Sequence, residues 1–384
     1  MSAGLRTVAT DATIDALIAA NAAVSIGVSG GKDSQAVALA VARHLDAVDH
    51  RGPRVLVHAD LGRVEWKDSL AVCQRLAAHL GLELIVVRRA AGDMLARWES
   101  RWLSRSKAYA ELETVKLTLP WATPAMRFCT SEMKVDPISS ALRKRFPKGP
   151  ILSVDGVRAQ ESHARAKKPI NSPAKKLARR ENIGLNWHPI LPWSVEGVFA
   201  EIDASGLEPH VAYRQHGSSR VSCNFCIMGS LPDLTIAANL PEHLDTYHVL
   251  VDLECRSTFA FQGNRWLGDV APDRLTADLR ARLALAKSAA ATRREAEAHI
   301  PAALLFDSKG WPSFVPDNGQ AQLLSDVRRR VGDAVGLSMS YTNADAIRAR
   351  YADLLNLRLA KAEMPKSKRI PLAQLPTAEK SRHS

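Results

Sequence analysis

The sequence predicts an α/β protein: a parallel Rossmann-like sheet with helices on both faces, followed by a cysteine loop and a helical C-terminal region. Residues 23–28 and 54–59 are short apolar stretches with the length and composition of buried strands. Each precedes a segment with apolar residues at helical spacing, residues 35–48 and residues 66–80. Strands that alternate with helices of this length imply right-handed crossovers, which produce a parallel sheet.

The elements that follow continue this pattern. Residues 82–87 and 151–154 are predicted as further strands, and residues 187–193 as the last edge element of the sheet. Further helices are expected at residues 93–120, from Ser131 onward, at 195–205, at 231–254 with a break at Pro241, and at 272–300. The tail beyond Pro365 has the composition of a disordered segment. We therefore expect an α/β domain at residues 1–205, a cysteine loop with helices at 206–260, and a helical region with a basic tail at 261–384.

The stretch SIGVSGGKDS joins the first strand to the first helix. Its two glycines allow close approach of the backbone to a ligand, and the following helix presents free N–H groups and its positive dipole end. The ATPase loop would need glycine at Ile26 and serine or threonine at Asp33, and the dinucleotide fingerprint has no match. The alternative is a glycine turn without a ligand. The candidate anion-binding residues are Ser29, Gly30, Gly31, Lys32, Asp33 and Ser34.

Asp60 and Gly62 follow the second predicted strand. In open parallel sheets, ligands bind at the carboxyl ends of the strands, where these residues should lie. We expect them to border a nucleoside, with a simple loop cap as the alternative.

Length and composition limit the class of protein. The chain has 384 residues, 46% hydrophobic and 24% charged, which suits one large or two modest globular domains. No apolar run approaches the length of a membrane span, and the start of the chain, with Asp11 and Asp15, lacks the plan of a signal peptide. We expect no membrane association and a cytoplasmic location.

The charge balance favours a polyanionic partner. The formal net charge is +12. A tRNA or DNA partner would fit this charge. Nucleotide phosphates in an active site, or a solvated basic face, are alternative explanations of it. The main basic cluster comprises Arg158, Arg165, Lys167, Lys168, Lys175, Lys176, Arg179 and Arg180, and a second group, Lys366, Lys368 and Arg369, begins the tail.

Five cysteines, an odd number, argue against a disulfide framework. Cys73 lies in an amphipathic helix pattern and is expected in the core. Cys223 and Cys226 form a C-x-x-C pair, and Cys129 lies in another loop at the sheet edge. Three thiols of this kind suit an iron–sulfur cluster, with zinc as the alternative. Cys255 is either a fourth ligand or, as we favour, a core residue.

Several motifs resemble known enzymes. The SGGKDS turn resembles the pyrophosphate loop of the adenine-nucleotide alpha-hydrolase-like enzymes, which holds the β- and γ-phosphates of ATP. With R-x-C-T-x-x-x-K at 127–134, G-x-R-x-x-E-S-x-x-R at 156–165 and W-x-P-I-x-x-W at 187–193, residues 22–230 resemble the phosphoadenosine phosphosulfate reductase family. The resemblance implies that Arg158 and Arg165 bind phosphate or sulfate and that Glu161 and Ser162 order their loop. The site residues in that loop are Gly156, Arg158, Glu161, Ser162 and Arg165.

The chain also departs from that family. Reductases of the family have a degraded first loop and a Glu-Cys-Gly-Leu-His segment, whereas this chain keeps Lys32 and Asp33 and has no such segment after Cys255. The chain also resembles ATP-dependent tRNA thiolation enzymes and DNA phosphorothioation sulfurtransferases. We therefore expect ATP-dependent adenylation coupled to sulfur transfer, with Lys32, Asp33 and Arg158 as catalytic residues.

The expected cofactors are ATP, Mg²⁺ and the iron–sulfur cluster, and the expected partners are a tRNA or DNA substrate and a sulfur-donor protein. One alternative is a phosphoadenosine phosphosulfate or adenylyl-sulfate reductase. A second alternative is a nucleotide-sensing module without turnover.

Overall fold

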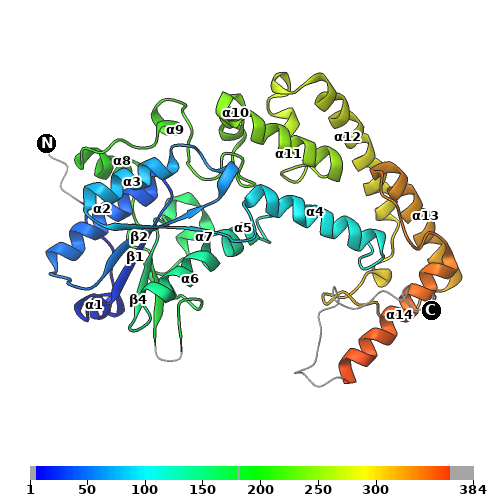
Figure 1. The fold of residues 1–384 in the computed structure, drawn as a ribbon, viewed down its shortest axis with the longest axis horizontal. Helices are drawn as coiled ribbons and strands as arrows, with labels where there is room; N and C mark the ends of the chain where they lie inside the picture. Colours follow the sequence, from blue (N-terminus) through cyan, green and yellow to red (C-terminus); the bar gives the residue numbers. More distant parts are fainter. Residues whose placement is uncertain (1–5, 180–181, 364–384) are drawn as a thin grey trace. The chain divides into compact units, whose positions relative to one another are not determined.

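The computed structural model describes residues 6–179 and 182–363 (Figure 1). Its centre is a six-stranded sheet with the order β3-β2-β1-β4-β6-β5. All neighbouring strands are parallel except β5 and β6. This confirms the predicted, mostly parallel α/β fold. The strands are β1 (Ala23–Val28), β2 (Arg54–Asp60), β3 (Glu83–Arg88), β4 (Ile151–Val154), β5 (Asn171–Pro173) and β6 (Gly184–Trp187).

Helices cover both faces of this sheet, as predicted. Successive residues of a strand point to opposite faces, and β2 shows this alternation in its packing. Leu56 belongs to the apolar core under α2 (Lys32–Ala47), α3 (Ser69–Leu80) and α8 (Val195–Ala204). Its neighbour Val55 belongs to a second core with Leu142 of α6 (Asp136–Arg145).

The other helices were predicted in part. The C-terminal region is helical, as expected, and the break at Pro241 is present as a single 3₁₀ turn. The remaining α-helices are α1 (Ala12–Ala19), α4 (Met94–Ala110), α5 (Phe128–Thr130), α7 (His163–Ala166), α9 (Val211–Arg214), α10 (Leu231–Asn239), α11 (Leu244–Ser257), α12 (Ala277–Ala298), α13 (Asn318–Val335) and α14 (Ala344–Glu363).

The edge of the sheet differs from the prediction. Residues 187–193 do not form an edge strand: β6 ends at Trp187, and the next residues form turns in which Leu191 N donates to His188 O. Pro189 and Pro192 lack the N–H groups that a strand needs. The edge is instead β5, which the sequence prediction missed.

Two helix limits also differ. The helix predicted at 93–120 ends at Ala110, because Leu112 adopts φ +48° and leaves the helical region. The helix predicted from Ser131 begins earlier, at Phe128, and passes through a π-helical turn, Ser131–Val135, before α6. Such π-turns are frequently found at functional sites. The predicted disordered tail lies outside the described residues.

The chain forms two compact units. The first runs to Glu99 and includes Trp121–Leu253 and Ala260–Arg280, and it contains the whole sheet. The second comprises Ser100–Pro120, Glu254–Phe259 and the residues from Ala281 onward. The boundaries expected at residues 205 and 260 stay predictions.

The second unit has a polar centre at Arg328, of which only 1% is exposed. Its guanidinium donates four hydrogen bonds of 2.6–3.1 Å to backbone carbonyls. The acceptors are the carbonyl oxygens of Tyr109, Ala110, Ser340 and Tyr341. These bonds tie the segment around residue 110 to the segment around residue 340 within this unit.

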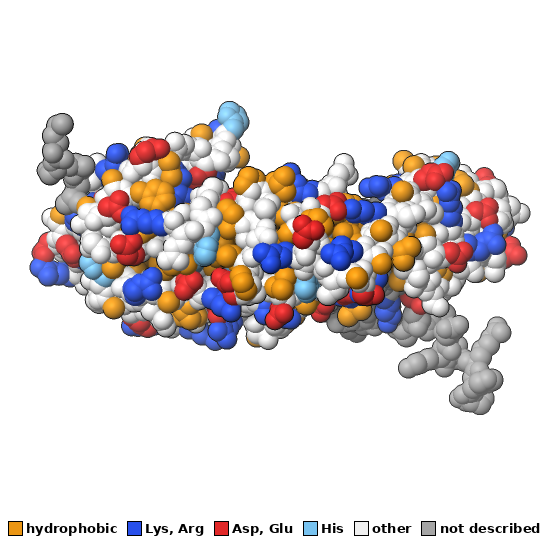
Figure 2. Space-filling view, turned by 90° about the horizontal axis from the view of Figure 1, so that it is seen from above, with side chains coloured by type: hydrophobic (Ala, Val, Ile, Leu, Met, Phe, Trp, Pro, Cys, Tyr) orange, Lys and Arg blue, Asp and Glu red, His pale blue; other side chains and the backbone are white. Residues whose placement is uncertain are grey.

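Surface charge is mixed on the face shown in Figure 2, where Lys and Arg side chains alternate with Asp and Glu. The positive surplus of the sequence is therefore not gathered there. Among the described residues, no helix is long and apolar enough to cross a membrane. The cytoplasmic location stays a prediction.

Candidate functional site

The turn between β1 and α2, residues 29–34, is shaped to receive an anion, and we call it the anion turn. Gly30 has φ +73°, and a Cβ atom there would lie 2.7 Å from Cα of Ser69, so only glycine fits. The Ser34 hydroxyl donates to Gly31 O at 2.8 Å and accepts from Ser29 N at 3.1 Å, which closes the turn. The N-terminus of α2 has no side-chain cap, so its first N–H groups and positive dipole end lie at this turn.

The three predicted catalytic side chains meet beside this anion turn. Asp33 Oδ2 lies 3.3 Å from Nζ of Lys32, and Asp33 Oδ1 accepts a 2.5 Å hydrogen bond from Nε of Arg158. Both cations are almost fully buried. Gly156 permits this approach, because a Cβ atom on it would lie 2.6 Å from Asp33 O. One carboxylate between two buried cations leaves a positive charge that suits a phosphate group.

The predicted loop residues after Gly156 bond to one another. Glu161 Oε2 accepts from Arg158 N at 2.9 Å and forms an ion pair with Arg165. Ser162 caps α7 by accepting from Arg165 N at 3.2 Å. Arg158 is thus held beside the anion turn, whereas Arg165 is engaged by Glu161.

A segment that sequence reasoning missed covers the anion turn. We call residues 213–222 the strap. Tyr213 Oη accepts hydrogen bonds from Lys32 N at 3.0 Å and from Val221 N at 3.1 Å. Lys32 Nζ donates to Ser219 O at 3.1 Å and lies 5.0 Å from the centre of the Tyr213 ring. Burial raises the pKa of Tyr213, so its hydroxyl stays neutral.

The strap is anchored by a carboxylate on α10. Asp233 Oδ1 accepts from Ser219 N at 2.8 Å and from the Ser218 hydroxyl at 3.1 Å. Its Oδ2 accepts from the hydroxyls of Ser219 and Ser230 at 2.8 and 2.7 Å. Burial alone would raise the pKa of Asp233, but the hydrogen bonds from the three serines outweigh burial and lower it.

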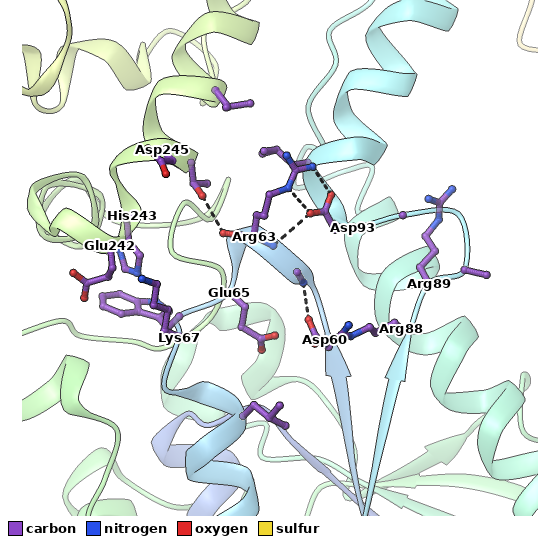
Figure 3. Close-up of a pocket in the computed structure, with 18 residues that line it drawn as sticks. Asp60, Arg63, Glu65, Lys67, Arg88, Arg89, Asp93, Glu242, His243 and Asp245 are labelled. Carbon is purple, nitrogen blue, oxygen red and sulfur yellow. Dashed lines mark hydrogen bonds and ion pairs between the residues drawn. The ribbon is translucent and has the colours of Figure 1, made fainter.

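A cavity of about 830 Å³ opens at the carboxyl ends of β2 and β3 (Figure 3). The predicted residues Asp60 and Gly62 both line it. Asp60 Oδ1 accepts from Gly62 N at 2.7 Å, and Asp60 Oδ2 accepts from Nε of Arg88 at 2.7 Å. Gly62 has φ +72°, and a Cβ atom there would lie 2.4 Å from Cβ of Asp93. The volume of this cavity falls in the usual range for small-molecule sites.

The far wall of this cavity comes from residues after position 240. In Figure 3, Glu242 and His243 lie beside Lys67, on the side of the cavity opposite Arg88 and Arg89. Burial lowers the pKa of His243, so its imidazole is neutral at physiological pH. Trp66 packs edge-on against His243, with ring centres 4.7 Å apart, and also lines a small pocket at the cysteine loop.

The other two predicted metal-ligating cysteines affect the Cys223 thiol. Its pKa is raised to about 12, chiefly by loss of solvation and also by the neighbouring Cys226 and Cys129, while Lys134 lowers it. Cys223 forms a β-bridge with Glu65, and Asn224 N donates to Val64 O at 2.8 Å. The structure therefore brings the C-x-x-C loop beside the loop after β2.

Three neighbouring thiols have the donor chemistry that iron–sulfur clusters and zinc require. In residues 6–179 and 182–363, however, no group of three or more His, Cys, Asp or Glu side chains is arranged to hold a metal ion. The high pKa of Cys223 shows that a thiolate there is costly without a cation, and a bound metal would supply one. The cluster stays a prediction.

The other two cysteines lie elsewhere. Cys73 is fully buried on α3, with Sγ 3.7 Å from Nδ1 of His58, which confirms the expected core position. Cys255 lies on α11 in the second unit and is partly exposed.

A parallel sheet whose first strand turns through glycines into a helix, with buried cations beside that turn, is an arrangement found in phosphate-binding α/β proteins. The sequence profile of the phosphoadenosine phosphosulfate reductase domain matches residues 23–233, more than half of the chain. The chain therefore belongs to this family. The cavity wall after position 240 lies outside the matched residues.

The chain is also similar to individual proteins. An uncharacterized 37.8 kDa protein of Escherichia phage 186 is 30% identical over 258 residues, which cover 57% of this chain and 71% of that protein. Phosphoadenylyl-sulfate reductase from Candida auris in a phosphate complex is 13% identical, with 57% of this chain and 98% of that one covered and a TM-score of 0.33.

Two further solved structures are similar at a comparable level. The NH3-dependent NAD synthetase of Campylobacter jejuni is 15% identical over 73% of this chain and 88% of its own, with a TM-score of 0.27. The U34-tRNA thiolase of Methanococcus maripaludis with its four-iron, four-sulfur cluster is 14% identical over 61% and 72%, with a TM-score of 0.26. Likenesses at these scores carry no argument about activity.

Proposed function

We propose that the protein is an ATP-dependent adenylating enzyme whose reaction is coupled to sulfur transfer. The observation that supports this best is the anion turn, in which Asp33 lies between Lys32 and Arg158 at the start of α2. Release of pyrophosphate places negative charge on the oxygen that bridged the α- and β-phosphates. Fixed N–H groups and buried cations stabilise such charge strongly.

The proposed reaction has two steps. An oxygen of the acceptor attacks the α-phosphorus of ATP, the bond to the bridging oxygen breaks, and pyrophosphate leaves with the electron pair. A sulfur nucleophile then attacks the adenylated centre, and AMP leaves. The nucleoside would lie in the cavity beside Asp60 and Gly62, and Mg²⁺ would screen the triphosphate.

Cys129, Cys223 and Cys226 would serve the sulfur step. When bound, an iron–sulfur cluster would supply an iron site that can carry sulfur, and zinc is the alternative metal. Of the three cysteines, Cys223 forms a β-bridge with Glu65 in the loop after β2, and Glu65 also lines the large cavity. A separate sulfur-donor protein would supply the sulfur, and the acceptor would be tRNA, a DNA backbone phosphate or a small molecule.

Family membership supports a second candidate, reduction of phosphoadenosine phosphosulfate or adenylyl sulfate. Such a reductase binds a nucleotide that is already activated and has no pyrophosphate to release. A nucleotide-sensing module would bind ATP without turnover. Release of pyrophosphate from ATP therefore separates the proposed function from both alternatives.

The test is pyrophosphate release from ATP by the purified protein, with Lys32→Met and Asp33→Asn as variants. Each removes one charge beside the anion turn, and we expect the rate to fall on the order of 10² to 10³-fold. Lys309→Met, at an exposed position in the second unit, is the matched control and should keep the full rate. Release of orthophosphate, or full activity in both variants, would refute adenylation at this site.

A further inference from the structure

β5 divides the described part of the basic cluster, residues 158–179, into two groups, and Arg180 lies outside the described residues. β6 is parallel to β4, and β5 runs antiparallel to β6, with Asn171 opposite Trp187 and Pro173 opposite Leu185. Residues that precede β5 therefore lie at the carboxyl ends of the parallel strands, together with the anion turn. Residues that follow β5 lie at the amino ends, which is the opposite edge of the sheet.

Three chain segments meet at that opposite edge. Arg143, in the last turn of α6, donates from Nη1 to Lys176 O at 2.6 Å, and Arg179 Nη2 donates to Arg143 O at 3.2 Å. The Asn182 side chain donates to Pro147 O and accepts from Gly149 N, both at 3.1 Å. We call the resulting surface the back-edge patch; its members are Arg143, Lys144, Lys148, Lys175, Lys176 and Arg179.

The charge of this patch is largely unneutralised. In the described part of the chain, Lys176 is its one member with an ion pair to a carboxylate, that of Asp136. The two arginines bond to backbone carbonyls instead. The negative end of the α6 dipole accounts for basic residues in the last turn of that helix, but not for Lys148, Lys175 or Arg179. Five of the six residues are exposed.

A nucleotide bound at the anion turn cannot account for this patch, because the strands separate the two edges. β4 has four residues, so its length is about 13 Å. None of the described cavities has a patch member in its lining, so no enclosed small ligand is indicated. We propose that the back-edge patch binds the phosphodiester backbone of a nucleic acid. A backbone with regularly spaced phosphates matches several exposed cations that share one surface.

The inference stands without the proposed function, because it depends on a surface remote from the anion turn. The test variant is Lys144→Ala/Lys148→Ala/Lys175→Ala. The matched control, Arg105→Ala/Lys107→Ala/Lys309→Ala, removes the same charge from exposed positions in the second unit. Binding of a labelled DNA duplex and of a labelled tRNA is measured by fluorescence anisotropy over a range of salt concentrations.

We expect the patch variant to bind roughly 10²-fold more weakly near physiological salt, and its salt slope to fall by about 0.9 for each lost contact. The control should bind like the wild type. The DNA and tRNA arms show which nucleic acid is preferred. Pyrophosphate release measured without nucleic acid should be unchanged in the patch variant, and failure of adenylation in the wild type would leave this inference intact.

Three results would overturn the inference. The first is equal weakening in both triple variants, which would indicate only overall charge. The second is absence of binding to both nucleic acids by the wild type. The third is binding of the wild type to vesicles with anionic lipids, lost in the patch variant, without binding to nucleic acid.

Discussion

The Tyr213 hydroxyl satisfies two backbone N–H groups with one oxygen atom, and one of them is the first N–H of α2. A phosphate at the anion turn would bond to the same N–H. The hydroxyl is neutral and buried, so it satisfies this donor without adding a charge. Tyr213 would therefore compete with such a phosphate, and we predict that a nucleotide displaces its hydroxyl.

This competition predicts that Tyr213→Phe binds ATP more tightly. The phosphate would no longer replace an existing hydrogen bond worth about 0.5–1.5 kcal/mol, so the dissociation constant should fall roughly 2- to 10-fold. The melting temperature should drop, because Val221 N–H loses its acceptor. Isothermal titration calorimetry and thermal unfolding measure the two effects.

Tyr351→Phe is the matched control, because its buried hydroxyl donates to Leu304 O in the second unit. It should lower the melting temperature without changing ATP affinity. Weaker or unchanged ATP binding by Tyr213→Phe would mean that the hydroxyl does not compete with phosphate.

Residues close in sequence were the easiest to predict. Two glycines between an apolar strand and a helix predict the SGGKDS turn. The contact between Arg158 and Asp33 could be predicted only from the family motif that contains Arg158. The contact between Lys32 and Tyr213 joins positions 181 residues apart, and no local pattern marks Tyr213 for that role.

Among the elements, the long parallel strands were predictable because buried strands are continuous apolar runs. β5 was not, because it has three residues, includes Pro173 and pairs antiparallel to its neighbour. That omission also made the basic cluster look like one surface. The π-helical turn at Ser131–Val135 has no sequence signature that periodicity could detect.

The strap depends on one carboxylate, so its stability should depend on pH. The pKa of Asp233 is lowered in the folded state, so its contribution is present above the ordinary value of about 4 and is lost as pH falls through the folded pKa. Asp233→Asn should therefore be less stable than the wild type at neutral pH. The difference should shrink below about pH 4.

Denaturant unfolding at several pH values measures this effect. The matched control is Asp245→Asn, a carboxylate at the cavity wall for which no hydrogen bond to the strap is present in the described chain. Its free energy of unfolding at neutral pH should stay close to that of the wild type. An equal loss for Asp233→Asn at every pH would refute the role of its ionised form.

The iron–sulfur cluster that we expect at the cysteine loop should give the protein a colour. We expect material purified without oxygen to be brown and to contain about four irons per chain, because three cysteines can hold a cubane cluster with one open iron. Cys129→Ala, Cys223→Ala and Cys226→Ala should each bleach it, whereas Cys73→Ala should not. Iron analysis and absorption spectra provide the measurement.

Cys255→Ala tests the remaining alternative for this loop. Retained colour would place Cys255 outside the ligand set, as we expect. Colourless anaerobic protein with one zinc per chain would refute the cluster and leave adenylation untouched.

At the scale of the molecule, the chemistry we propose lies in the first unit, so a change that destabilises the second unit should leave it intact. Arg328→Met should destabilise the second unit by about 3 kcal/mol or more, because several buried carbonyls lose their donor. Pyrophosphate release per folded molecule should be unchanged. Denaturant unfolding and the assay, both at low temperature, measure the two quantities.

Arg329→Met is the matched control. Its side chain is half exposed and pairs with Asp326 on the same helix, so its loss should cost at most about 1 kcal/mol. Loss of pyrophosphate release in folded Arg328→Met protein would show that the second unit takes part in the reaction.

The antiparallel strand β5 also bears on solubility at high concentration. Sheet edges expose unpaired backbone groups that can recruit a strand from another molecule and start aggregates. β5 ends this sheet with three residues, and its last residue, Pro173, has no N–H to offer. Lys175 and Lys176 follow directly, so an approaching edge would also meet like charge. Replacing Pro173 by a β-branched residue would add an N–H group to β5 and allow this edge of the sheet to pair with a strand of another molecule, which favours fibre growth.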